Sequence, residues 1–244
     1  MPEKLKVYEI KLKLYALNDI PIKDTLEIES EFIDSALLKN EKFKKLHEER
    51  CYKLYCFDGL YPLGKNGIRK KDTIYIMTIR TVNKELKDFL EQELCNHSTK
   101  TLKGLVTATR VVPHKLIDKI YTLTPAIIKT ENGYWKSGMP LSEYEGRLFV
   151  NLIKKYKQFT GICLDEHFDF YTSICFHNKV PVSFAYEKKR EGLKLLGDKI
   201  TLQISSDARA QELAYFALGC GIGEINARGA GFCNYSFAKE VGTC

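Results

Sequence analysis

The sequence predicts an α+β fold built from two tandem β-α-β-β-α-β units that pack against each other. Strand-like segments and amphipathic helical segments alternate in the same order in both halves of the chain, although no sequence repeat is visible. The length of 244 residues allows two domains of about 120 residues each. The hydrophobic fraction of 44% is enough for a packed core.

The first half contains the complete pattern. Residues 8–16 alternate apolar and polar side chains, as a half-buried strand does. Residues 73–81 are β-branched and apolar on both faces, as in a central strand. The expected elements are, in order, a strand over 8–16, a helix over 23–40, strands over 52–57 and 73–81, a helix capped by Asn83, and a strand over 102–112.

The second half repeats this order more loosely. The expected elements are a strand over 119–129, a helix opened by a capping box of Ser142 and Glu145 and ended by Gly161, strands over 168–177, 180–186 and 193–205, a helix capped by Asp207, and a strand over 232–237. Both units therefore read as ferredoxin-like, RRM-like domains, over residues 1–115 and 116–244. No low-complexity linker separates them, so we expect tight packing near residues 113–120.

Composition narrows the class of protein. No stretch approaches the roughly 20 apolar residues that span a membrane, and no apolar segment follows the charged N-terminus, so a cytoplasmic protein without membrane contact is expected. The eight cysteines form no C-x-x-C pair, which favours reduced, mostly buried thiols. Cys163 with His167, and Cys175 with His177, lack zinc-site spacing. The sequence predicts neither a metal site nor a cofactor.

Basic residues form runs in a chain of net charge +7, which favours a polyanionic partner. Any single run is most simply a solvated surface, but three runs that flank expected strands together indicate a surface for nucleic acid. The residues of these runs are Lys42, Lys44, Lys45 and Arg50; Arg69, Lys70 and Lys71; and Lys188, Lys189 and Arg190.

A glycine-rich segment lies between the last expected helix and the last strand, with the sequence GCGIGEINARGAGF over residues 219–232. Glycine permits positive φ, and successive N–H groups in such a loop can bind a phosphate, so an anion-binding nest is predicted. Arg228 would add a positive charge to it. The helix-to-strand order excludes a dinucleotide-binding fingerprint, and the segment lacks the Lys-Ser or Lys-Thr of a Walker loop. An irregular helix exit would need only one or two glycines.

A histidine lies in a basic loop expected between a helix and an aromatic strand. His47 precedes Tyr52, Tyr55 and Tyr61. An imidazole suits removal of the proton from an RNA 2′-hydroxyl because its unperturbed pKa is about 6.5. Lys53 can stabilise charge that develops on the phosphorus, and tyrosines can stack on bases. Taken alone, a histidine among basic residues is more often a surface residue.

These features together resemble the CRISPR repeat-processing endoribonucleases of the RAMP superfamily, the Cas6 family. The terminal motif reads Gly221-Ile222-Gly223, five residues, then Gly229-Ala230-Gly231-Phe232. Residues 52–57 with Gly59-Leu60-Tyr61-Pro62 look like the N-terminal signature of that family. In the C-terminal half, residues 192–195 also fit the pattern of the family. The resemblance covers essentially the whole chain.

The resemblance implies metal-independent cleavage within repeats of a precursor CRISPR transcript, giving a 2′,3′-cyclic phosphate and a 5′-hydroxyl. His47 matches the catalytic histidine of the family and Lys53 a basic residue shortly after it. Some members use a tyrosine of the first helix, where this chain has Phe32, so a His47-centred site assisted by Lys53 or Tyr52 is expected. The expected RNA-binding residues are Lys44, Lys45, Arg50, Arg69, Lys70, Lys71, Gly221, Gly223, Arg228, Gly229 and Gly231.

Three alternatives remain open at this point. A non-catalytic RAMP subunit that binds guide RNA would share the fold and the glycine-rich segment but would need no histidine. A general RNA-recognition module would carry the aromatic RNP pattern, which is absent. A small-molecule enzyme is compatible with the fold alone. A monomer and a homodimer, acting alone or with effector-complex subunits, are all compatible with the sequence.

Overall fold

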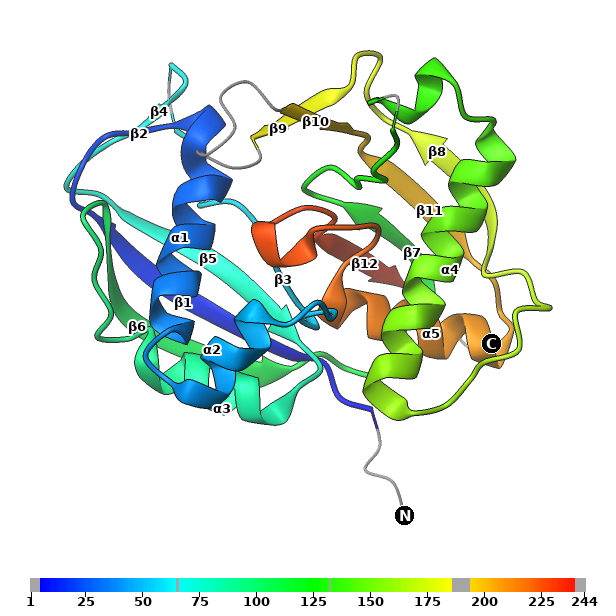
Figure 1. Cartoon of the computed structure of the whole chain (residues 1–244), viewed down its shortest axis with the longest axis horizontal. Helices are drawn as coiled ribbons and strands as arrows, with labels where there is room; N and C mark the ends of the chain where they lie inside the picture. Colours follow the sequence, from blue (N-terminus) through cyan, green and yellow to red (C-terminus); the bar gives the residue numbers. More distant parts are fainter. Residues whose placement is uncertain (1–4, 65, 132, 186–193, 240–244) are drawn as a thin grey trace.

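The computed structural model describes residues 5–64, 66–131, 133–185 and 194–239. The basic run at residues 188–190 and the first half of the 192–195 segment lie outside the described residues. The chain forms two four-stranded antiparallel sheets, each covered by helices, so the predicted α+β class is confirmed (Figure 1). Among the described residues, no helix is both long enough and apolar enough to cross a membrane.

The N-terminal sheet has the strand order β3-β5-β1-β6, which is the ferredoxin-like arrangement of four antiparallel strands. Its main elements are β1 (Tyr8–Ala16), α1 (Thr25–Leu37), β3 (Tyr55–Phe57), β5 (Ile74–Thr81), α3 (Lys84–Glu93) and β6 (Leu102–Val111). Four short elements are added to this unit: β2 (Ile20–Pro21), η1 (Ile22–Asp24), α2 (Glu41–Glu48) and β4 (Ile68–Arg69).

The C-terminal sheet has the corresponding order β12-β7-β11-β8. Its main elements are β7 (Ile117–Thr122), α4 (Leu141–Thr160), β8 (Tyr171–Phe176), β11 (Ile200–Ile204), α5 (Ala208–Cys220) and β12 (Cys233–Phe237). An antiparallel pair, β9 (Val182–Ala185) and β10 (Lys194–Gly197), lies between β8 and β11 in the chain and forms a sheet of its own. Two 3-10 turns, η2 (Trp135–Ser137) and η3 (Asn226–Arg228), complete the unit.

Three of the predicted helix ends are confirmed. The side chain of Asn83 accepts a hydrogen bond from the N–H of Leu86, and Asp207 accepts one from Arg209. Gly161 ends α4 with a φ of 74°, the left-handed conformation that glycine adopts without strain.

The predicted capping box at Ser142 and Glu145 is wrong. Helix α4 begins two residues earlier than this box requires, after Pro140, and the N-cap makes no side-chain hydrogen bond to its first turn. Glu145 instead accepts a hydrogen bond from the Tyr171 hydroxyl at 3.0 Å, which joins the helix to β8. Glu145 therefore bonds to a residue of another element instead of the N-terminus of its own helix.

Several predicted strands differ from the structure in extent. The strand expected over 193–205 is two strands, β10 and β11, which belong to different sheets. The strand expected over 119–129 ends at Thr122, because the following residues bind the glycine-rich loop: the N–H of Gly231 donates to Pro125, and the N–H of Glu224 donates to Ile127. The strand expected over 52–57 begins only at Tyr55.

Each domain has its own apolar core, and the two domains pack directly against each other. Three valines directly beside the ends of N-terminal strands belong to the core cluster of the C-terminal domain: Val7, Val82 and Val112. Gly219 of α5 lies against Val82, where an added Cβ would come within 2.7 Å of its Cγ1. The expected tight packing is therefore observed, whereas the boundary between residues 115 and 116 stays a prediction. Of the seven described cysteines, all free, three are buried: Cys56, Cys220 and Cys233.

Helix α1 buries an acidic side chain that no hydrogen bond satisfies. Glu29 is fully buried, and neither carboxylate oxygen has a partner among the described residues. Burial, and next the nearby carboxylate of Asp58, raise the pKa of Glu29 well above its ordinary value, while Arg69 opposes the shift. The pKa of Asp58 is itself raised to about 6, mainly by burial. The folded chain therefore keeps the Glu29 proton at pH values where the unfolded chain has lost it.

Glu29→Met is expected to stabilise the fold by about 1–3 kcal/mol at pH 8, because it removes a buried group without a hydrogen-bond partner. The gain should be smaller at pH 5. An acid whose folded-state pKa is raised contributes stability below the unfolded pKa of about 4.3, and that contribution is lost as pH rises. Urea denaturation at both pH values measures the difference, with the exposed Glu31→Met as control. An equal gain at both pH values would show that Glu29 does not hold its proton.

Candidate active site

His47 lies in the last turn of α2, not in a loop between a helix and a strand. Asn40 caps this short helix by accepting hydrogen bonds from the N–H groups of Lys42 and Phe43. The ring of Phe43 is buried and packs on Phe89 of α3, with ring centroids 4.7 Å apart. This anchored helix fixes the backbone of His47, whose side chain stays 29% exposed.

The imidazole of His47 faces a carboxylate of the first helix. Its Nδ1 lies 3.4 Å from Oδ1 of Asp34, in α1. Burial raises the pKa of Asp34, and the charges of Arg228, His47 and Lys53 together with a hydrogen bond from Ser30 act against that rise. A carboxylate in this position can orient the imidazole ring.

The other oxygen of Asp34 is bound by the glycine-rich loop of the C-terminal domain. Arg228, the last residue of η3, places Nη1 2.8 Å from Oδ2 of Asp34 and 3.0 Å from Oγ of Ser30. In Figure 1 this loop, drawn in orange to red, lies between α1 and the C-terminal sheet. One carboxylate thus joins the predicted histidine to the predicted arginine, although the two belong to different domains.

Lys53 supports the histidine through the backbone of α2. Its ammonium donates to the carbonyl oxygen of Leu46 and, at 2.6 Å, to that of Glu49. Both carbonyls belong to the C-terminal end of α2, where a positive charge is favourable. Lys53 is therefore close to His47, as predicted, but its charge is turned toward the helix end.

Tyr52 faces the C-terminal domain. Its backbone N–H and carbonyl form hydrogen bonds of 2.9 and 2.7 Å with the side-chain amide of Gln158 in α4. Its ring centroid lies 5.9 Å from Nζ of Lys155. Burial, and then the charge of Glu224, raise the pKa of its hydroxyl. The structure therefore does not place Tyr52 with His47, Asp34 and Arg228. The predicted catalytic role of Tyr52 stays a prediction.

A buried lysine that the sequence analysis missed holds the glycine-rich loop from inside. Lys155 of α4 is 2% exposed, and burial lowers the pKa of its ammonium. Its Nζ donates to the carbonyls of Gly221 at 3.0 Å and Gly223 at 2.6 Å, and to Oδ1 of Asn226 at 2.6 Å. The signal available in the sequence was its spacing, which places Lys155 on the apolar side of α4 with Leu152 and Tyr156. All three side chains are buried in the structure.

Asn226, also missed, completes this internal support. Its Nδ2 donates to the carbonyl of Ile222 at 3.0 Å and to that of Ala230 at 2.9 Å. The amide therefore bridges the two ends of the loop while its oxygen accepts from Lys155. This arrangement fixes the turn from which Arg228 reaches the N-terminal domain.

The glycines of this loop are required by packing, and the predicted anion nest is wrong for three of them. The N–H groups of Gly221, Gly229 and Gly231 already donate to backbone carbonyls. Gly231 has a φ of 65°, and an added Cβ would lie 1.8 Å from the carbonyl oxygen of Ile222. Gly223 also has positive φ and packs against Ile127. Contact of these four buried glycines with RNA stays a prediction.

The predicted basic surface is divided. Arg69 is buried, which contradicts its expected role on that surface: its guanidinium donates to the carbonyl of Leu60 and, at 2.7 Å, to Oγ1 of Thr25. Lys70 is exposed and pairs with Asp19 at 3.0 Å. The remaining members of the predicted set are exposed, except for the half-buried Lys44, and their contact with RNA stays a prediction: Lys44, Lys45, Arg50 and Lys71.

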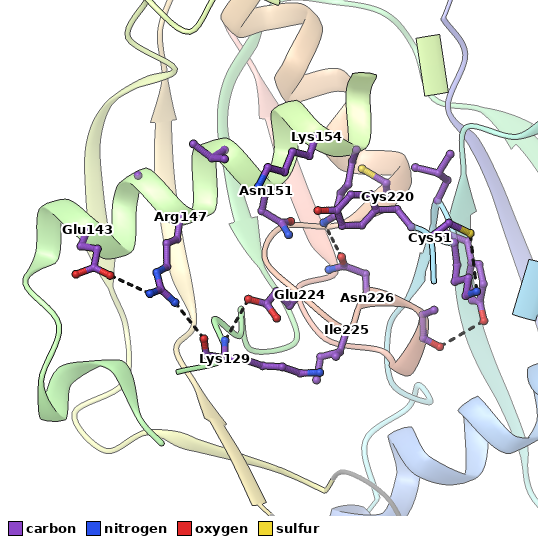
Figure 2. Close-up of a pocket in the computed structure, with 18 residues that line it drawn as sticks. Cys51, Lys129, Glu143, Arg147, Asn151, Lys154, Cys220, Glu224, Ile225 and Asn226 are labelled. Atoms are coloured by element: carbon purple, nitrogen blue, oxygen red, sulfur yellow. Dashed lines mark hydrogen bonds and ion pairs between the residues drawn. The ribbon is translucent and has the colours of Figure 1, made fainter. Parts of the chain in front are cut away.

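A pocket of about 690 Å³ lies beside the glycine-rich loop and Lys53 (Figure 2). Its walls are residues 51–55 and one side of α4, and its floor is residues 224–227 of the loop. Tyr52 and Lys53 line it. Within the part of the chain that the structure describes, no group of three or more His, Cys, Asp and Glu side chains is placed to hold a metal ion.

The sequence and the fold have recognisable relatives. The family model described as "CRISPR associated protein Cas6, C-terminal" matches residues 111–235. The chain is 24% identical over 213 residues to the CRISPR-associated endoribonuclease Cas6 2 of Methanocaldococcus jannaschii, an alignment that covers 82% of this chain and 87% of that relative.

Two solved structures share the whole two-domain arrangement. One, described as CRISPR associated protein Cas6, has a TM-score of 0.68 at 20% identity and covers 94% of this chain and 99% of its own. The other, described as a RAMP protein binding different RNA substrates, has a TM-score of 0.66 at 16% identity with the same coverages. These two likenesses concern the fold. The family model matches more than half of the 244 residues, and the chain therefore belongs to the family of CRISPR-associated Cas6 proteins.

Proposed function

We propose that this protein is an endoribonuclease that cuts precursor CRISPR RNA within its repeats. The observation that carries the proposal is the placement of His47 beside Asp34, with the guanidinium of Arg228 on the other oxygen of the same carboxylate. Membership of the Cas6 family supports it, as does a relative named an endoribonuclease. The RAMP protein of similar fold is described as binding RNA substrates.

The proposed chemistry is attack of a ribose 2′-hydroxyl on the adjacent phosphorus. The 2′-oxygen bonds to phosphorus as its proton passes to a base, and the bond to the 5′-oxygen breaks as that oxygen gains a proton. The products are a 2′,3′-cyclic phosphate and a 5′-hydroxyl, and the reaction consumes no water and requires no metal. Asp34 faces Nδ1 of His47, which leaves Nε2 to exchange a proton with the RNA.

Two cations can stabilise the charge that develops on the phosphorane oxygens. Arg228 lies on the far side of Asp34, and its side chain is 42% exposed, so it can also meet RNA. Lys53 lies at the end of α2 and would have to leave the carbonyls of Leu46 and Glu49 to contact a phosphate. Arg228 is therefore the better placed of the two in the free protein.

A second candidate is a non-catalytic RAMP subunit that binds guide RNA. It is favoured by one observation: the charge of Lys53 is engaged by α2, and Tyr52 is turned toward α4, so two of the three expected catalytic side chains do not meet at His47. The two candidates differ in whether bound RNA is cut.

The first test is incubation of the wild-type protein with end-labelled repeat RNA in EDTA, with binding and cleavage measured separately. We expect one cut per repeat and a 2′,3′-cyclic phosphate at the new end. Tight binding without cleavage, in EDTA and with Mg²⁺ alike, would favour the guide-binding subunit. Cleavage only with Mg²⁺ would contradict the proposed chemistry while leaving an endoribonuclease.

A further inference from the structure

The pocket lies between the two domains, next to the loop that carries Arg228. Figure 2 shows Asn151 projecting from α4 and Glu224 rising from the loop that forms its floor. Both residues line the pocket, and so does Tyr52 of the N-terminal domain. A volume of about 690 Å³ is in the range of pockets that enclose a small molecule or a nucleotide.

The polar groups of this pocket can accept further hydrogen bonds. The carboxylate of Glu224 accepts one, from the N–H of Lys129 at 3.2 Å. Oδ1 of Asn151 is buried and has no hydrogen-bond partner among the described residues. Glu224 and Tyr52 both line the pocket, so one ligand can contact both residues. A ligand with hydrogen-bond donors and a flat ring could therefore bond to Glu224 and Asn151 and stack on Tyr52.

The pocket borders the group formed by His47, Asp34 and Arg228 in two places. Lys53 lines it, and the ammonium of Lys53 bonds to Leu46, the neighbour of His47. Ala227 also lines it, and the next residue, Arg228, bonds to Asp34. A nucleotide in the pocket would thus lie next to a phosphate held at His47.

We propose that this pocket binds the base of a nucleotide beside the cleaved phosphate, and that it prefers a base with an exocyclic amino group over uracil. The inference rests on the proposed function. A carboxylate repels phosphate, so Glu224 favours the base end of the nucleotide. Carboxylates accept hydrogen bonds from base amino groups, and single-stranded RNA is commonly recognised by stacking on aromatic rings together with hydrogen bonds to base edges. Tyr52 supplies the ring, and Glu224 and Asn151 supply the acceptors.

The test is single-turnover cleavage of a set of repeat RNAs in which each of the three positions on either side of the cut is changed to uridine in turn. At one position we expect wild type to lose about tenfold or more in rate, the discrimination that a good base contact provides. In Glu224→Ala, and separately in Asn151→Ala, that loss should fall below about threefold. Each variant is compared with itself on two RNAs, so partial misfolding cancels.

The matched control is Glu143→Ala. Glu143 is a carboxylate at the rim of the same pocket, and it is paired with Arg147 at 3.0 Å. It should keep the full discrimination against uridine. Equal cleavage of all the RNAs by wild type, or undiminished discrimination in both the Glu224 and Asn151 variants, would overturn the proposal. If wild type cuts none of the RNAs, the proposed function fails, and the affinities of the same RNAs for the same variants decide the pocket separately.

Discussion

His47→Ala is expected to slow cleavage of a repeat RNA by about 10²–10⁴-fold, the usual contribution of a positioned acid or base. Its affinity for the RNA should change little, because the imidazole is one partly exposed group among many possible contacts. The rate should be measured in single turnover with excess protein in EDTA, so that product release does not mask the chemical step. Binding is measured on the same RNA under the same conditions.

A second histidine provides a matched control. Nε2 of His114 lies 3.4 Å from the carboxylate of Glu212, the same separation that joins His47 to Asp34. The His114 side chain is 37% exposed, close to the 29% of His47. His114→Ala should therefore cut like wild type. Equal losses in both variants, or full activity in His47→Ala, would remove His47 from the chemistry and favour the guide-binding subunit.

The pairing that defines the site could not be predicted from local sequence. Asp34 and Arg228 are 194 positions apart, and only the packing of the two domains brings them to 2.8 Å. The position of His47 shortly before the aromatic strand follows directly from the sequence, whereas the short helix α2 that carries it was not predicted. The carboxylate opposite it carries no such local signal.

Runs of charge gave the least secure predictions, since sequence neighbours do not show which member turns inward. Arg69 is buried against Leu60 and Thr25, while the adjacent Lys70 and Lys71 are exposed. The β-α-β-β-α-β order was predictable because strand and helix periodicities are local properties. The capping residues Asn83 and Asp207 were predictable for the same reason, as each binds an N–H group two or three residues away.

The glycine-rich loop shows how a correct local inference can lead to a wrong role. Positive φ was expected at its glycines and is found at Gly221, Gly223, Gly229 and Gly231. Their number is explained by close backbone packing inside the protein. The loop presents the side chain of Arg228 to Asp34, and the buried Lys155 bonds to the loop from inside.

Lys155→Met is expected to lower the free energy of unfolding by about 1–3 kcal/mol, the cost of leaving buried hydrogen-bond acceptors without their donor. The methionine fills similar space but leaves the carbonyls of Gly221 and Gly223 and the Oδ1 of Asn226 without their donor. Urea denaturation measures the loss. Lys154→Met, at the exposed neighbouring position of the same helix, should change stability by less than about 0.5 kcal/mol.

Lys155→Met also tests whether the glycine-rich loop positions the group formed by His47, Asp34 and Arg228. Once the loop loses its internal donor, Arg228 should no longer hold Asp34 in place, and cleavage by the folded fraction should fall while bulk RNA binding by the exposed lysines persists. Lys155→Arg, which keeps a charged donor, should recover part of the activity if the hydrogen bonds to the loop matter. A stable, fully active Lys155→Met protein would show that packing of the glycines alone fixes the loop, and that Arg228 reaches Asp34 without support from α4.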